Sequence, residues 1–445
     1  MPKVTIIMPS LNVAKYIKPC MDSVLSQSLQ DIEVLAVDAG STDGTLEILE
    51  EYAVRDKRVR VLVSDRRSYG YQMNLGLQNA TGEYVGVVET DDIIVEDMYE
   101  TLYETACESD ADYVKGQGTM MLEFSTGAIW MDNDMVISGD ASFYGDVVKP
   151  CDMPELLMRD YYLWTGIYKR DFLEGVRFND TPGAAFQDIG FLLQVFSKAK
   201  RAVYLKKRVY LYRQDNMNAS VKNWKGFRYL WNEDDFCKSF WAGLSEEWRS
   251  AVCCKLLFQT RRRFQTMVAS GSFWEEAEED MNTIGQRLQD ALSDGYLSEA
   301  ELTADEWKLL HMVIENPRLV YEWYSELYGD KKLSLERFLE PLKGQEVIVF
   351  GCGRWGRYLH AIIESRKLGN VIAYCDNQAE LWGSVLQGTE VLSPQEAVSV
   401  SENAKLVIAN KYHAEEIKEQ LLGLGMSEDK MLIYTLGVEL DLLIF

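Results

Sequence analysis

The sequence predicts an α/β protein: a parallel sheet covered by helices on both faces, then a helical segment, then a second, smaller α/β domain. Over residues 1–110, short apolar runs alternate with stretches of helical periodicity. The apolar runs are nearly continuous, which is typical of parallel strands buried on both faces. The alternation stops near residue 223 and resumes near residue 343. We therefore expect three domains, at residues 1–222, 223–340 and 341–445.

The elements of the first domain follow one another regularly. Four strands are expected, at residues 4–8, 32–37, 59–63 and 84–88. Helices are expected after Asn12, after residues 41–43, and at residues 69–79 and 97–109. Pro19 marks either a break or the first turn of the first helix. Residues 111–222 mix short strands and helices.

The two later domains differ in character. Residues 223–340 are rich in Trp, Leu, Glu, Arg and Lys with long 3.6-residue periodicity, so we expect a helical spacer and packing platform. Strands are then expected at residues 346–350 and 371–375, separated by a glycine-rich turn and a helix.

Composition limits the function. With 46 basic and 70 acidic residues among 445, the formal net charge is −24, which argues against a broad nucleic-acid-binding surface. The eight cysteines include no C-x-x-C pair, which indicates free thiols in a reducing compartment. No signal peptide and no apolar run of transmembrane length is visible, so we expect a cytoplasmic protein without a membrane span; peripheral contact with the inner face of the cell membrane stays open.

Three polar clusters follow the strands of the first domain. Pro9, Ser10 and Asn12 follow the first strand, residues 38–44 the second, and residues 89–92 the fourth. In a parallel sheet these strand ends meet at one edge, which is where ligands bind. For Asp43, a helix-capping role is an equal alternative.

The cluster Glu89-Thr90-Asp91-Asp92 indicates a metal site. Crowded carboxylates repel one another unless a cation offsets the repulsion. Hard oxygen ligands suit Mg²⁺ or Mn²⁺, which commonly share substrate phosphates. The alternative is a solvated loop that caps the helix at residue 97.

Five ordered segments give the first domain a family resemblance. They are VTIIMPSLN (4–12), CMDSVLSQS (20–28), IEVLAVDAGSTDGT (32–45), NLGLQNATGEYVGVVETDD (74–92) and WTGIYKRDFL (164–173). Residues 1–220 resemble the family 2 glycosyltransferases, which implies a GT-A-type nucleotide-diphospho-sugar transferase fold.

The resemblance implies roles for the polar clusters. Asp38 would contact the nucleotide base, and Pro9, Ser10 and Asn12 would line the nucleotide pocket. Asp91 would lie at the ribose and the metal, and Asp92 would ligate the metal that bridges the donor diphosphate.

The resemblance also implies a catalytic base. Family members carry an acidic pair about a hundred residues downstream, and Gln187-Asp188 is the candidate here, with Asp188 as the base. The alternative for Asp188 is a helix N-cap. Trp164 would stack on the acceptor sugar or lie in the core. The segment YLYRQDNMNAS (210–220) is similar to the one that closes over the donor.

Four positions depart from the family pattern. Two are minor: Ala39 replaces the second Asp of the common Asp-Asp-Gly-Ser, and Glu89 is a conservative change of the acid before Thr-Asp-Asp. The other two bear on the site. Gln187 replaces the usual Glu, and Met73 replaces an Arg that can reach the diphosphate. Arg66, Arg67 or Arg213 are the candidates to replace that charge.

The third domain carries Gly351-x-Gly353-x-x-Gly356 after a strand, with Asp376 at the end of the next strand. This is the context of a dinucleotide site, and an NAD-type nucleotide is the minor alternative. The region resembles the small Rossmann-like domains appended to bacterial sugar-modifying enzymes, for which a structural or partner-binding role is favoured.

These observations predict a metal-dependent, inverting glycosyltransferase. It would move a sugar from a nucleotide-diphosphate sugar, a UDP-sugar by resemblance, to a hydroxyl of a glycan or lipid-linked glycan acceptor in bacterial surface polysaccharide synthesis. Two alternatives stay open: a non-catalytic nucleotide-sugar-binding scaffold, and a nucleotide-sugar oxidoreductase or epimerase that uses the C-terminal glycines.

Overall fold

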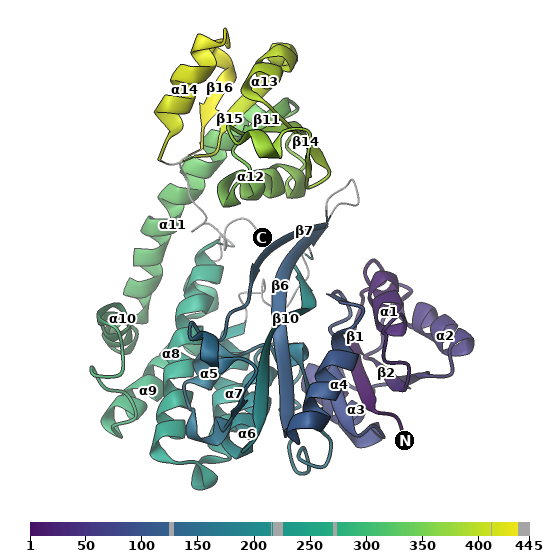
Figure 1. Cartoon of the computed structure of the whole chain (residues 1–445). Coiled ribbons are helices and arrows are strands. Elements are labelled where there is room, and N and C mark those ends of the chain that lie inside the picture. Colours follow the sequence, from purple (N-terminus) through teal and green to yellow (C-terminus); the bar gives the residue numbers. More distant parts are fainter. Residues whose placement is uncertain (124–128, 215, 217–225, 270–273, 411, 435–445) are drawn as a thin grey trace. The chain divides into compact units, whose positions relative to one another are not determined.

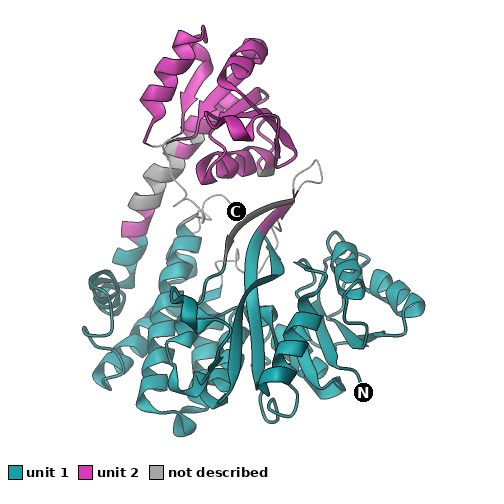
Figure 2. Ribbon diagram, in the orientation of Figure 1, with its two compact units in different colours: residues 1–120, 132–321 teal, residues 121–131, 322–445 magenta. Residues whose placement is uncertain are grey.

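The computed structural model describes the chain apart from residues 124–128, 215, 217–225, 270–273, 411 and 435–445. The chain forms two compact units (Figure 2). Unit 1 contains residues 1–120 and 132–321, and unit 2 contains residues 121–131 and 322–445. The three predicted domain boundaries stay a prediction.

Unit 1 is built on a mixed sheet with the strand order β3-β2-β1-β4-β9-β6-β10-β5, with β7 paired to β6 and β8 paired to β10 (Figure 1). Its parallel half consists of β1 (Val4–Ser10), β2 (Ile32–Asp38), β3 (Val59–Val63) and β4 (Tyr84–Val87). The other strands are β5 (Ile93–Ile94), β6 (Tyr113–Glu123), β7 (Ile129–Asp134), β8 (Val147–Val148), β9 (Gly166–Lys169) and β10 (Ala202–Arg213). The predicted parallel α/β sheet is confirmed, and β9 joins it antiparallel to β4.

The helices around the parallel strands begin close to the predicted positions. They are α1 (Ile17–Leu25), α2 (Thr45–Arg55), α3 (Tyr69–Asn79) and α4 (Met98–Ser109). Pro19 lies in the first turn of α1, which was one of the two expectations for it. The strands are apolar because they are buried: every residue of β1 and β2 lies in the interior.

Residues 223–321 of the helical segment belong to unit 1. Its helices in this unit are α7 (Phe227–Lys238), α8 (Glu246–Ala269), α9 (Glu278–Ser293) and α10 (Ala304–Glu315). Two helices precede it in the chain, α5 (Leu156–Arg159) and α6 (Gln187–Lys198). Helix α8 contacts α5, α7 and α9, and α7 contacts α6. The helical segment therefore adjoins the helix that carries the predicted base.

Unit 2 has a sheet with the order β13-β14-β12-β11-β15-β16. Its strands are β11 (Glu346–Phe350), β12 (Asn370–Cys375), β13 (Val385–Leu386), β14 (Thr389–Leu392), β15 (Ala404–Ile408) and β16 (Met431–Ile433). Its helices are α11 (Pro317–Leu339, which begins in unit 1), α12 (Arg354–Ser365), α13 (Pro394–Val400) and α14 (Ala414–Gly423). All strand pairs except β13–β14 are parallel, so this is a Rossmann-like, doubly wound sheet, as predicted.

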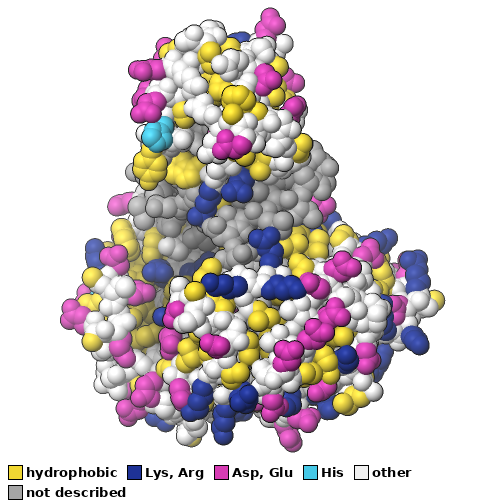
Figure 3. All heavy atoms as spheres, in the orientation of Figure 1, with side chains coloured by type: hydrophobic (Ala, Val, Ile, Leu, Met, Phe, Trp, Pro, Cys, Tyr) yellow, Lys and Arg dark blue, Asp and Glu magenta, His cyan; other side chains and the backbone are white. Residues whose placement is uncertain are grey.

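The charged side chains of the surface are mixed in sign, and the cysteines are unpaired. Acidic and basic side chains are interspersed over the face shown in Figure 3. All eight cysteines are free thiols. Among the described residues, no helix is both long and apolar enough to cross a bilayer.

Candidate active site

The loops after β1 and β2 are tied together by hydrogen bonds. The Asn12 N–H donates to Ser41 Oγ over 2.9 Å, and Asn12 Oδ1 accepts the Thr42 N–H over 2.8 Å. Asn12 adopts a left-handed backbone with φ of +55°, a conformation that Asn tolerates better than most residues. The first two polar clusters therefore meet, as the sequence predicts.

Asp38 organises the second loop from inside. Its side chain is fully buried, and Oδ1 accepts the N–H groups of Gly40 and Ser41, both over 2.8 Å. Its Oδ2 accepts the Ser41 hydroxyl over 2.6 Å. These three bonds lie within its own loop, and contact with a nucleotide base stays a prediction. Ser10 and Pro9 are also buried, at the end of β1.

Asp43 bonds to the start of α2, although the N-cap residue of that helix is Gly44. Its Oδ1 accepts both the N–H and the hydroxyl of Thr45, the first residue of α2, over 3.1 and 2.6 Å. Its Oδ2 accepts the Ala14 N–H over 3.0 Å. The carboxylate thus holds the start of α2 against the loop after β1.

Asp92 is a buried anchor for the end of β10. It has no exposed surface, and its oxygens accept the Arg213 N–H over 2.7 Å and the Tyr210 hydroxyl over 2.8 Å. Burial raises the pKa of Asp92 well above its usual range, and the charge of Asp91 adds to the rise. Thr90 connects this loop to β1, because its hydroxyl donates to the Pro9 carbonyl over 2.9 Å.

Asp91 is the more open carboxylate of the pair. It is half-buried, and Oδ2 accepts the Asn216 amide over 2.8 Å. The Arg213 guanidinium donates to the Asp91 carbonyl over 2.7 Å. Among the described residues, no group of three or more His, Cys, Asp or Glu side chains is arranged to hold a metal. A metal site here would consist of one or two carboxylates completed by substrate phosphates and water, which is the usual way Mg²⁺ is held.

Glu89 is a site residue to which the sequence assigned no role. Its Oε1 accepts the Tyr69 hydroxyl over 2.7 Å. Burial, with added repulsion from Asp91 and Asp188, raises the pKa of Glu89 to about 8. The Tyr69 N–H donates to the Gly183 carbonyl over 2.9 Å, so Tyr69 connects the acidic cluster to the turn before α6, which carries Asp188. The position of Glu89 within the acidic cluster was the available signal.

Asp188 lies in the first turn of α6 and is half-buried. The N-cap is Phe186, with φ of +69° and no capping side chain, so Asp188 is not the N-cap. Burial raises the pKa of Asp188, while the charges of Lys255 and Lys115 and the N–H groups at the helix start oppose that rise. The sequence singled out neither of these two lysines.

Gln187 explains how the family Glu can be absent. It is 1% exposed, its Oε1 accepts the Ala185 N–H over 2.7 Å, and its Nε2 donates to the Gly183 carbonyl over 3.3 Å. This amide needs both a donor and an acceptor, so Gln fits the buried turn better than an ionised Glu would.

Met73 occupies the position of the family Arg, and it is fully buried in the core. The positive charges on the donor side therefore come from other residues. Arg67 donates to the Gly40 carbonyl over 3.1 Å, and Arg66 pairs with Asp180 over 3.4 Å. Arg213 lies directly behind Asp91 and Asp92. Of the three candidates, only Arg213 adjoins the acidic pair.

Trp164 packs under the site. Its ring stacks on Tyr210 with centroids 4.1 Å apart, and only 7% of its surface is exposed. Its place in the core favours the structural alternative, and stacking on an acceptor stays a prediction. Of the segment 210–220, residues 215 and 217–220 lie outside the described residues.

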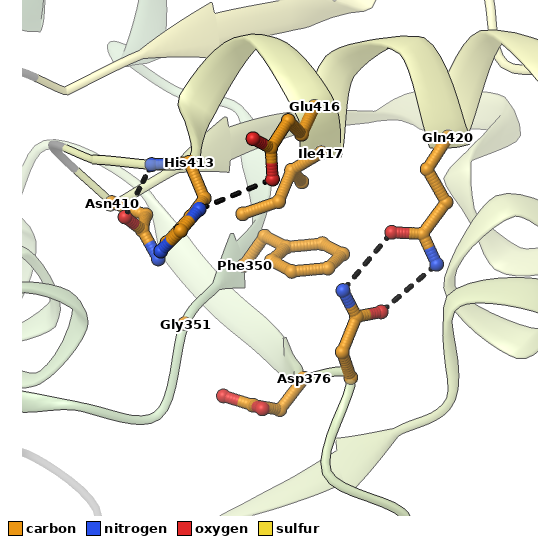
Figure 4. A pocket seen from close by; sticks show the side chains of 9 residues that line it. Phe350, Gly351, Asp376, Asn410, His413, Glu416, Ile417 and Gln420 are labelled. Carbon is orange, nitrogen blue, oxygen red and sulfur yellow. Dashed lines mark hydrogen bonds and ion pairs between the residues drawn. The ribbon is translucent and has the colours of Figure 1, made fainter.

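The predicted C-terminal site residues belong to unit 2. A cavity of about 310 Å³ lies beyond the ends of β11, β12 and β15 (Figure 4). Gly351, Asp376, Asn410 and His413 are among its lining residues. Asp376 accepts the Cys352 N–H over 2.8 Å, so the acid and the glycine-rich turn bond to each other. A bound NAD-type nucleotide stays a prediction.

The chain resembles known proteins in both units. The family model "Glycosyl transferase family 2" matches residues 5–144, and "C2185-like, N-terminal" matches residues 343–432. The chain is 34% identical over 220 residues to glycosyltransferase GlyA of Streptococcus pneumoniae, which covers 47% of this chain and 30% of GlyA. It is 30% identical over 229 residues to GlyG of the same organism, which covers 47% of this chain and 70% of GlyG.

A solved structure shares the fold. The crystal structure of S. aureus TarS 1-349 in complex with UDP-GlcNAc aligns with a TM-score of 0.52 at 20% identity, covering 74% of this chain and 92% of that one.

Proposed function

This chain belongs to glycosyltransferase family 2, and from that premise we propose that it transfers a sugar from a UDP-sugar to a hydroxyl of a bacterial glycan. The observation that carries the proposal is a pair of hydrogen bonds made by Tyr69: its hydroxyl donates to Glu89 of the acidic cluster over 2.7 Å, and its N–H donates to the Gly183 carbonyl over 2.9 Å, in the turn before the helix that carries Asp188.

We assign Asp91 as the carboxylate that contacts a divalent metal. It is the more exposed of the two, while both oxygens of Asp92 already accept protein hydrogen bonds. Asp92 then positions Tyr210 and Arg213 around the donor. Mn²⁺ or Mg²⁺, when bound, would offset the negative charge of the nucleoside diphosphate leaving group.

Asp188 takes the proton of the acceptor hydroxyl. The acceptor oxygen then forms a bond to the anomeric carbon while the bond from that carbon to the diphosphate oxygen breaks, so UDP leaves with the electron pair. A single displacement of this kind inverts the anomeric centre. A positioned general base contributes about 10²–10⁴-fold to such a step.

The loops after β1 and β2 would hold the nucleotide. Asp38 acts by fixing the turn through Gly40 and Ser41, and Asn12 fixes the opposing loop. Pro9 and Ser10 form the floor between them. Arg213 bonds to both residues of the acidic pair and takes the place of the Arg that Met73 replaces.

UDP release tests the proposal. We expect the purified chain with Mn²⁺ to release UDP from a UDP-sugar when a glycan acceptor is added, and UDP-GlcNAc is the first donor to test because the TarS complex contains it. Asp188→Asn should slow release about 100-fold or more and leave the thermal shift with UDP and Mn²⁺ unchanged. Asp171→Asn, an exposed carboxylate just after β9, is the matched control.

The outcomes separate the alternatives. Donor binding without turnover against any acceptor would favour the non-catalytic scaffold. Equal release by the Asp188→Asn variant would remove Asp188 from the base role but not the transferase proposal. No thermal shift with UDP-, GDP- or dTDP-sugars would contradict the proposal itself.

A further inference from the structure

Helix α8 contacts the residue that precedes the first turn of α6. The Arg263 guanidinium lies over the ring of Phe186, 5.2 Å from its centroid, and Phe186 is the N-cap of the helix that carries Asp188. Eight residues earlier on α8, Lys255 Nζ lies over the ring of Tyr161 at 4.5 Å. The first contact places α8 next to the start of the helix that carries the candidate base, and the second places Lys255 against the chain just after α5.

Lys255 is a buried cation without a hydrogen-bond partner. It is 2% exposed, and within the described part of the chain its Nζ has none. Burial lowers the pKa of Lys255 to about 8. A buried polar group left in this state costs free energy, so its presence in a native structure calls for an explanation such as a ligand.

Arg262 extends the same face of α8. It follows Lys255 by seven residues, which returns to the same side of a helix. Both cations lie near the ring of Phe258, Lys255 at 5.6 Å and Arg262 at 5.8 Å. Arg262 makes no ion pair with any described residue. Its charge also contributes to the lowered pKa of Lys255, so the two cations repel each other.

The composition makes this pair of cations unusual. The chain has 70 acidic residues against 46 basic ones, so acids to neutralise Lys255 and Arg262 are not scarce. Crowded like charges cost stability unless a counter-ion offsets them. The same reasoning that points to a cation at the crowded carboxylates points to an anion here.

The charges of two carboxylates oppose the lowering of the Lys255 pKa. They are Asp188 and Asp160, and Asp160 is already paired with Lys115 over 2.5 Å. Lys255 forms no ion pair with Asp188. On the donor side, Arg213 is the cation beside Asp91. The contact of Arg263 with Phe186 places this stretch of α8 at the start of the helix that carries the base, where the acceptor hydroxyl must arrive.

We propose that Lys255 and Arg262 form an anion subsite that binds a phosphate or carboxylate group of the acceptor and presents the acceptor hydroxyl to Asp188. The proposal rests on the proposed function and adds the substrate class, an anionic glycan or a phosphate-bearing acceptor. A bound oxyanion would supply the missing hydrogen bonds of the ammonium, and the planar guanidinium suits either oxyanion. The flexible stem of Lys255 lets Nζ turn from Tyr161 towards the ligand.

Thermal shifts with small anions test the subsite without any turnover. Inorganic phosphate and glucuronate are titrated at constant ionic strength, with and without UDP and Mn²⁺ to fill the donor pocket. We expect phosphate or glucuronate to raise the unfolding temperature of the unmodified chain in both conditions. Lys255→Met and Arg262→Met should each lower the affinity for the anion about tenfold or more, as expected for a lost charge-assisted hydrogen bond.

Lys198→Met is the matched control. Lys198 is exposed in the last turn of α6, ten residues from Asp188 or about 15 Å along the helix, which is beyond the screening length of about 10 Å. This variant should keep the full anion response. The larger of the phosphate and glucuronate responses identifies the group that the acceptor carries.

Three results would overturn the subsite: no anion response in the unmodified chain, a full response in Lys255→Met and Arg262→Met, or a response that disappears when UDP and Mn²⁺ are present. The proposed function fails differently. An absent shift with UDP and Mn²⁺, together with an anion response that needs Lys255, would reject the donor and retain the subsite.

Discussion

At the scale of single residues, Asp91 and Asp92 are neighbours in sequence but differ in what they contact. Asp92 is fully buried and holds Tyr210 and Arg213, whereas Asp91 is half-buried and its carboxylate accepts the Asn216 amide. The sequence predicted an acidic cluster at this strand end, and the cluster is there. It could not predict which carboxylate the loop turns inward, because that depends on β10, more than a hundred residues later.

Substitution of Asp91 should therefore affect metal-dependent UDP binding, and substitution of Asp92 should affect stability. Asp91→Asn should abolish the Mn²⁺-dependent part of the UDP thermal shift and change the free energy of unfolding by less than about 0.5 kcal/mol. Asp92→Asn should lower that free energy by about 1–3 kcal/mol, because its amide N–H groups would face the Arg213 N–H. Urea unfolding and UDP titration of both variants measure this. A large stability loss in Asp91→Asn alone would reverse the assignment.

Lys255 gives a residue-scale prediction with a defined pH dependence. Its pKa in the folded chain is about 8, below the value of about 10.4 in an unfolded chain. Between these values the unfolded state binds more protons, so this group makes stability rise with pH. Below pH 8 the buried charge exerts its full cost.

Lys255→Met should then be more stable than the unmodified chain at pH 7, by about 1–3 kcal/mol. The difference should shrink as the pH rises from 8 towards 10. Urea unfolding of both proteins across this range measures it, with Lys198→Met as the reference. A destabilised Lys255→Met at pH 7 would show that the lysine is needed for packing. A more stable variant with a lost anion response marks a residue kept for function.

At the scale of elements, the packing partners of α8 could not be predicted from the sequence. The 3.6-residue periodicity of residues 223–340 predicted helices, and the structure has them. Periodicity gives the faces of a helix but not the element that each face meets. Lys255 looks like an ordinary polar residue in the sequence, and its burial beside Tyr161 follows from the packing of α8 on α5. The same limit applies to Asp38, whose strand-end position was predicted but whose bonds within its own turn were not.

The packing of α8 beside α6 predicts a pH-dependent rate. Asp188 must be ionised to accept a proton, and burial raises its pKa while Lys255 opposes the rise. The acid limb of kcat/KM should lie above the usual range of Asp, and activity should fall as the pH drops through it. Lys255→Met removes the opposing charge, so its acid limb should move to higher pH. An unchanged limb in Lys255→Met would mean that the two helices are not electrically coupled at the base.

At the scale of the whole molecule, the sequence predicted both sheets because each has its own alternating pattern. The assignment of residues 121–131 to unit 2 had no such signal. Leu122, near the end of β6, is buried in the core of unit 2 with Leu335 and Val347. An apolar residue in a strand shows that it is buried, but the pattern does not show in which core.

The glycines of unit 2 separate a fold requirement from a ligand requirement. A Cβ on Gly356 would lie 1.8 Å from the Gly351 carbonyl oxygen, whereas a Cβ on Gly353 would meet nothing within 4 Å. Gly356→Ala should therefore destabilise unit 2 by about 1–3 kcal/mol, and Gly353→Ala should leave its stability unchanged. Both variants should keep the thermal shift with UDP and Mn²⁺, because the candidate donor site lies in unit 1.

If NAD raises the unfolding temperature of the unmodified chain and Gly353→Ala removes that response, unit 2 binds a dinucleotide through close backbone approach at this turn. If NAD has no effect in either protein, packing alone accounts for the conformation around Gly356, and the glycine pattern needs no ligand.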